Sequence, residues 1–176
     1  MDYIFKKLLA GTAATVLAAS LFFTTPGFKV KGDYLEVKGV LKGIFTEKVQ
    51  RILKTATTIN VTFHLSLVLK QNGEVKVLKK RIAHNIRFSP LKEEYLVTKG
   101  GKRWIGKDKN IAYKKFSSYK TRFRQPFKDG SFIVNFYIEA HISYKSKLEL
   151  EFSGAALWDH FIPSKSIKQI KLGNHE

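Results

Sequence analysis

The 176-residue sequence contains no cysteine. This absence excludes disulfide bonds, thiolate metal sites and catalysis by a cysteine nucleophile. It also excludes a lipid-modified N-terminal cysteine. Because no covalent cross-link can stabilise the fold, the chain must depend on its hydrophobic core, which argues against a small disulfide-rich scaffold.

Acidic residues are scarce. The chain has 14 Asp and Glu against 32 Lys and Arg, which gives a formal net charge of +18. A charge of this size favours anionic partners such as phospholipid head groups, anionic envelope polymers, nucleic acid or acidic proteins. A basic surface that is simply solvated would carry the same charge, because net charge bears on association and not on fold.

Motifs of known chemistry are also lacking. The chain has no G-x-S-x-G nucleophile elbow, and Gly100-Gly101-Lys102 does not have the spacing of a phosphate-binding loop. The five histidines have no fixed spacing to carboxylates, so we predict no metal site, no cofactor and no catalytic residue. Two arrangements leave an enzyme open as an alternative. His84 and His141 would approach one another if two hairpins stack, and Asp159 could orient His160.

The N-terminus carries the clearest signal that is present. Leu8–Phe23 is an uncharged run of 16 residues, preceded by Lys6-Lys7. As a helix it would extend about 24 Å, which is less than the ~30 Å hydrocarbon core of a bilayer. A basic start, a short apolar run and a small polar exit are typical of a secretory signal.

We therefore expect residues 1–27 to be a signal peptide or an uncleaved N-terminal anchor, followed by one domain at 28–176. Cleavage after Gly27 or after Ser20 would each leave small residues at the cut. The domain would then work in the periplasm of a bacterium, or on the extracytoplasmic face of its membrane, and would keep a net charge of +17.

Alternation of apolar and polar residues predicts most of the domain as β-strands. Residues 59–69 alternate without a break, and Asn72-Gly73 then predicts a type I′ hairpin turn. The returning strand covers 74–88, with a shift of phase near 78–81 that suggests a bulge. Further strands are expected at 34–41, 93–98, 132–144, 148–152 and near 167–172.

Two short amphipathic helices are expected. One covers 46–56 with Thr46 as its N-cap, and the other covers 108–119 and begins at Asp108. A strand at 119–127 is an almost equally good interpretation of the residues that follow. Residues 104–109 look like a loop. We predict a mainly β fold with a minor helical part: an antiparallel β-sandwich or curved sheet with two short helices.

The order of these elements resembles a known family. The hairpin INVTFHLSLVLKQNGEVKV, the segment EEYLVTKG, the long strand SFIVNFYIEAHISY and a Trp-containing tail are similar to the domain of unknown function 4390 family, a group of small exported bacterial proteins. The similarity covers about Phe45–Trp158. It implies export and a β-rich fold, with no assigned activity and no catalytic residues to transfer.

Basic and aromatic residues crowd together between residues 99 and 128. Cations interleaved with aromatic rings occur on surfaces that bind lipid head groups, polysaccharides or single-stranded nucleic acid. The same pattern arises when the rings face the core and the lysines face water. We predict an anionic-partner site formed by Lys102, Arg103, Trp104, Lys107, Arg122 and Arg124.

The sequence thus favours an exported, non-catalytic envelope domain. It would bind an anionic envelope component, either lipid head groups or a polymer, or an acidic protein partner. One alternative is an envelope hydrolase or transferase that uses His and Asp or Glu. A second is a nucleic-acid-binding module, which would require that the N-terminus is not a signal.

Overall fold

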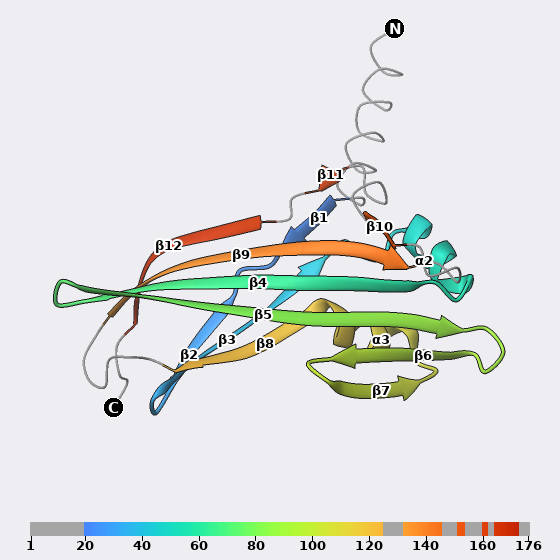
Figure 1. Cartoon of the computed structure of the whole chain (residues 1–176), viewed down its shortest axis with the longest axis horizontal. Helices are drawn as coiled ribbons and strands as arrows, with labels where there is room; N and C mark the ends of the chain where they lie inside the picture. The colour runs from blue at the N-terminus through green and yellow to red at the C-terminus, as the bar shows by residue number, and fades with distance from the viewer. Residues whose placement is uncertain (1–19, 125–131, 146–150, 154–159, 162–163, 173–176) are drawn as a thin grey trace, which may run out of the picture.

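The computed structural model describes residues 20–124, 132–145, 151–153, 160–161 and 164–172. Two β-sheets pack against one another, and two short helices lie beside them (Figure 1). Strand pairing is antiparallel except between the first strand and a two-residue strand near the C-terminus. The predicted mainly β fold with two helices is therefore confirmed.

The larger sheet has seven strands in the order β10-β9-β4-β5-β6-β7, with β12 also paired to β9. Its strands are β4 (Thr58–Gln71), β5 (Glu74–Ser89), β6 (Glu94–Lys99), β7 (Lys102–Gly106), β9 (Phe132–Lys145), β10 (Glu151–Ser153) and β12 (Ser164–Leu172). The long strands β4, β5 and β9 form its frame, and β7 lies at its rim (Figure 1).

The β4–β5 hairpin closes through Asn72 and Gly73, whose φ angles of 49° and 82° fit the predicted turn. The two strands pair without interruption from Thr58↔Arg87 to Gln71↔Glu74. The expected bulge near residues 78–81 is therefore wrong. Most side chains of β5 from 74 to 81 are exposed on both faces, so this stretch has no need of strict alternation.

The smaller sheet is built around β3 (Tyr34–Lys42). β8 (Ser118–Arg124) pairs along one edge of β3, and β2 (Gly27–Lys31) and β1 (Ser20–Phe23) follow one another along the other edge. β11 (His160–Phe161) pairs with β1.

β1 is part of the hydrophobic core. Leu21 is fully buried and Phe23 is 4% exposed, whereas Phe22 between them points outward. Beyond the strand, the Thr24 hydroxyl accepts a hydrogen bond from the Val40 backbone N–H and donates to the Val40 carbonyl. The folded domain therefore includes residues from Ser20 onward, where the sequence predicted no strand.

Both predicted helices are confirmed, as α2 (Glu47–Lys54) and α3 (Lys109–Ser117). Thr46 Oγ1 accepts from the Val49 N–H at 3.3 Å, and Asp108 Oδ1 accepts from the Ile111 N–H at 2.9 Å. These caps satisfy N–H groups that have no partner inside the helix.

Aromatic rings join the two sheets in the core. Phe28 of β2 meets Phe136 of β9 edge-on at 5.4 Å between centroids, and Tyr119 of β8 lies 5.3 Å from Phe63 of β4. Phe116 on α3 is also fully buried. The helix packs on β5 and β6 and leaves a hollow beside the β6–β7 hairpin. No helix among the described residues is long and apolar enough to cross a membrane.

Candidate anion-binding site

The β6–β7 hairpin supports the candidate site. Gly100 and Gly101, with φ angles of 53° and 80°, form the two-residue turn between Lys99 and Lys102, which are register partners. Glycine meets this need because both turn positions require positive φ. The expected loop at 104–109 is wrong for its first three residues, because the closed turn brings residues 102–106 beside β6 as a strand.

Trp104 lies on the inner face of β7, toward α3. Its indole covers Gly106, so that a Cβ atom there would stand 2.6 Å from the ring. The Lys115 ammonium of α3 lies 5.6 Å from the indole centroid, close enough for a cation–π interaction. The glycine and the lysine together fix where the ring lies.

A pocket of about 600 Å³ opens between the hairpin, α3 and β8; we call it the basic pocket. Its lining residues are Ile82, Val97, Lys99, Gly100, Lys102, Arg103, Trp104, Lys115, Ser118 and Lys120. Five of them are cationic, and none of these lining residues, all within the described part of the chain, carries a carboxylate. The pocket therefore concentrates positive charge beside one aromatic ring.

Lys99 is the most enclosed cation of the basic pocket. Its ammonium donates to the Ser118 carbonyl at 2.5 Å and to the Ser118 hydroxyl at 3.4 Å. Burial lowers the pKa of Lys99, and the positive charge of Lys115 lowers it further. An anion between the two ammonium groups would relieve this repulsion.

The structure brings together three of the six predicted site residues, Lys102, Arg103 and Trp104. Lys107 is exposed and follows β7, outside the pocket lining. Arg122 and Arg124 lie on β8 and form ion pairs: Arg122 with Glu36 at 3.3 Å and Arg124 with Asp33 at 3.6 Å. Their charges are thus partly neutralised within the protein.

The Glu36 carboxylate forms ion pairs with three cations on the smaller sheet. Lys120, Arg122 and Lys31 approach its carboxylate at 3.2, 3.3 and 3.9 Å. Burial alone would raise the pKa of Glu36, but hydrogen bonds from Lys120 and Arg122 outweigh it, so the pKa lies below its ordinary value. This cluster offsets some of the basic charge on β8.

Sequence reasoning did not select Lys99, Lys115 and Lys120. They lie in the same basic segment, but they come from β6, α3 and β8 and meet only in the folded chain. The one local signal for a strand here was the Gly100-Gly101 turn, which is followed by residues 102–106 with one aromatic and one β-branched side chain.

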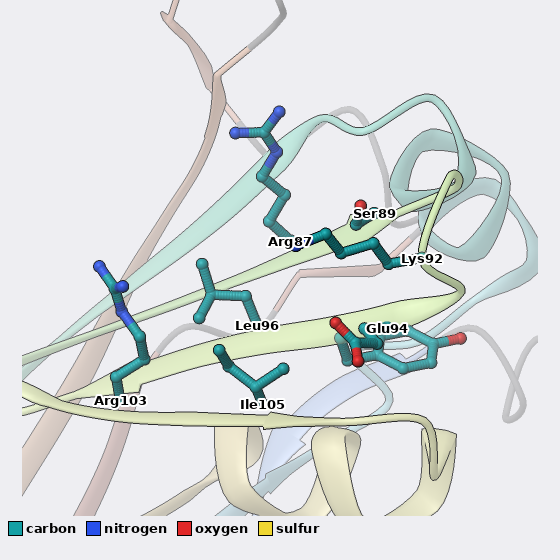
Figure 2. Close-up of a pocket in the computed structure, with 8 residues that line it drawn as sticks. Arg87, Ser89, Lys92, Glu94, Leu96, Arg103 and Ile105 are labelled. Carbon is teal, nitrogen blue, oxygen red and sulfur yellow. The ribbon is translucent and has the colours of Figure 1, made fainter.

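A second pocket, of about 290 Å³, lies on the opposite face of the same strands; we call it the outer pocket. Figure 2 shows Leu96 and Ile105 side by side, with the Arg87 and Arg103 side chains extending nearby. The remaining lining residues are Ser89, Lys92, Glu94 and Tyr95. Arg103 lines both pockets.

His84 and His141 do not converge as the alternative enzyme would require. His84 faces the core, where its Nδ1–H donates to the Phe116 carbonyl at 2.8 Å, whereas His141 is exposed on the other face of the sheet. The expected approach of His84 to His141 is wrong, because they are out of phase across β4. His141 instead lies 4.8 Å from the His64 ring and 3.2 Å from the Glu139 carboxylate.

Within the described residues no group of three or more His, Cys, Asp or Glu could hold a metal ion. Asp159 lies outside the described residues, as does the side chain of His160, so the Asp159-His160 pair is not placed.

No protein family, curated protein or solved structure matches the chain. The resemblance to the domain of unknown function 4390 family thus stays a prediction. Function must be argued from the site itself.

Proposed function

We propose that this protein is an exported, non-catalytic β-domain of the bacterial envelope that binds an anionic partner through the basic pocket. The observation that carries the proposal is the pocket lining, which joins five cations and Trp104. Of the five, Lys120 pairs with Glu36 at 3.2 Å, so Lys99, Lys102, Arg103 and Lys115 are the cations left to attract an anion. The ligand group would be a phosphate or carboxylate, presented by a lipid head group, an envelope polymer or an acidic protein. The predicted secretory signal at Leu8–Phe23, whose last four residues form β1, favours these partners over nucleic acid.

The chemistry of the pocket suits binding. Ammonium groups on several elements attract an anion, and Arg103 can offer two parallel N–H donors to a carboxylate or phosphate. Trp104 provides an apolar face for the group that carries the anion. The described lining offers no pair of groups arranged as nucleophile and base.

Charge reversal tests this proposal. Lys102→Glu with Lys115→Glu removes two cations from the pocket, and Lys70→Glu with Lys76→Glu makes the same change in net charge near the far tip of the β4–β5 hairpin (Figure 1). Binding to phosphatidylglycerol vesicles and to poly-glutamate would be measured for both variants at low salt.

Because each charge near an anionic surface contributes about 1 kcal/mol and the two reversals change the net charge by four, the pocket variant should bind on the order of a thousandfold more weakly. The hairpin variant should lose much less. Equal losses in both variants would mean that net charge alone drives binding, and wild-type binding by the pocket variant would refute the proposal.

A further inference from the structure

β7 ends the larger sheet. Among the described residues it pairs with β6 alone, which leaves its other edge without a strand partner (Figure 1). α3 packs mainly on β6, and its Lys115 side chain lies over Trp104 of β7. A free edge presents unpaired N–H and C=O groups, to which another extended chain can pair.

The turn fixes which groups point outward. A two-residue turn makes Lys99 and Lys102 a hydrogen-bonded pair, and antiparallel pairing then alternates along the ladder. Trp104 and Gly106 therefore direct their backbone groups toward β6. The N–H and C=O of Arg103 and Ile105 face away from the sheet, so the edge offers two donors and two acceptors.

Both faces of this edge carry recognition features. On one face Arg87, Leu96 and Ile105 are cross-strand partners in a row, and they line the outer pocket (Figure 2). On the other face Trp104 and Lys115 line the basic pocket. A strand added beside β7 would place alternate side chains next to each of these surfaces.

We propose that the free edge of β7 binds an extended acidic segment of a partner protein by strand addition. Apolar side chains of the segment extend the row of Leu96 and Ile105, and acidic side chains on its other face meet Lys115 and Trp104. The proposal rests on the anionic-partner function and names the partner as a peptide segment.

Charge complementarity decides for an acidic peptide. Lys102 and Lys115 lie on the face that the acidic side chains of the segment would meet, and the lining of the basic pocket on that face has no carboxylate. A lipid head group would use the cations but leave the backbone groups of Arg103 and Ile105 unpaired. A competing explanation is that the short length and basic residues of β7 protect its edge from pairing with other chains. That explanation predicts no peptide binding.

The test uses a capped peptide of alternating Glu and Val and the same peptide methylated on alternate backbone nitrogens. The full-length protein should bind the first, with slower hydrogen exchange at the Arg103 and Ile105 amides. Methylation on the edge that faces β7 should weaken binding roughly tenfold, because two backbone hydrogen bonds are lost.

A pair of protein variants separates backbone pairing from charge. Ile105→Pro removes an outward N–H that β6 does not use, and Ile105→Val keeps it. The proline variant should lose peptide binding and the valine variant should retain it, while phosphatidylglycerol vesicles report separately on the basic pocket.

Three results would overturn the inference: equal binding of the methylated and unmethylated peptides, no protection of the Arg103 and Ile105 amides, or vesicle binding with no peptide binding. If charge reversal in the basic pocket has no effect on any probe, the anionic-partner function fails first. If peptide methylation and Ile105→Pro leave binding unchanged while charge reversal weakens it, the anionic-partner function stands and strand addition fails.

Discussion

Two buried polar side chains, His84 and Tyr119, distinguish this core from an apolar one. The Nε2 atom of His84 and the hydroxyl of Tyr119 are enclosed without a hydrogen-bond partner among the described residues. Burial lowers the pKa of His84 to about 4, opposed by its hydrogen bond to the Phe116 carbonyl and reinforced by the nearby charge of Lys99. Substitution of either side chain should change the free energy of unfolding or its dependence on pH.

His84 should make the protein less stable in acid. Above pH 6.5 its ring is neutral in the folded and unfolded states, but between pH 6.5 and 4 only the unfolded chain takes up the proton. The free energy of unfolding should fall by about 3 kcal/mol across this window. His84→Asn should flatten the dependence in urea titrations from pH 7.5 to 4. An unchanged slope would show that the ring titrates normally.

Tyr119→Phe should leave the protein as stable as before or more stable by about 1 kcal/mol. Burial raises the pKa of Tyr119, and its hydroxyl pays for desolvation without a hydrogen bond in return. The urea midpoint measures the change. A loss of more than about 1 kcal/mol would mean that the hydroxyl has a partner.

At the scale of elements, β1 bears on where the signal could be cleaved. Leu21 and Phe23 are buried in the core, so cleavage after Gly27 would remove two core side chains together with the Thr24 hydrogen bonds to β3. Cleavage after Ser20, or retention of the whole segment, would keep Leu21 and Phe23 in the core.

Neighbouring phenylalanines provide a matched test in the full chain. Phe23→Ala should lower the free energy of unfolding by about 3–5 kcal/mol, because Phe23 is only 4% exposed. Phe22→Ala, at 43% exposure, should change it by about 0.5 kcal/mol or less. If the mature protein begins at Phe28, both substitutions will leave its stability unchanged.

Elements with a strong local signal could be predicted from the sequence. β4 alternates over its full length because one face is buried throughout, and Asn72-Gly73 adopts the backbone that its turn requires. β1 and β7 could not be predicted in this way. β1 lies at the end of an apolar run whose composition is typical of a secretory signal. β7 is a five-residue edge strand that forms only through pairing with β6.

At the scale of the whole molecule, the positive charge is not evenly neutralised. Glu36 and Asp33 pair with cations of the smaller sheet, including Lys120 at the border of the basic pocket. The other four cations of that pocket have no carboxylate beside them in its lining. Three of the six predicted site residues meet there because they are neighbours in sequence. The lysines from β6, α3 and β8 could not be predicted, since only the packing of distant elements brings them to the pocket.

Trp104 offers the most direct measurement of the central claim, that the basic pocket receives the anionic partner. In a Trp158→Phe background, phosphatidylglycerol vesicles or poly-glutamate should change Trp104 emission in a saturable way. Lys115→Glu should abolish the change, and Lys76→Glu should leave it nearly intact. Binding that leaves Trp104 emission unaltered, or that both substitutions weaken equally, would contradict the account.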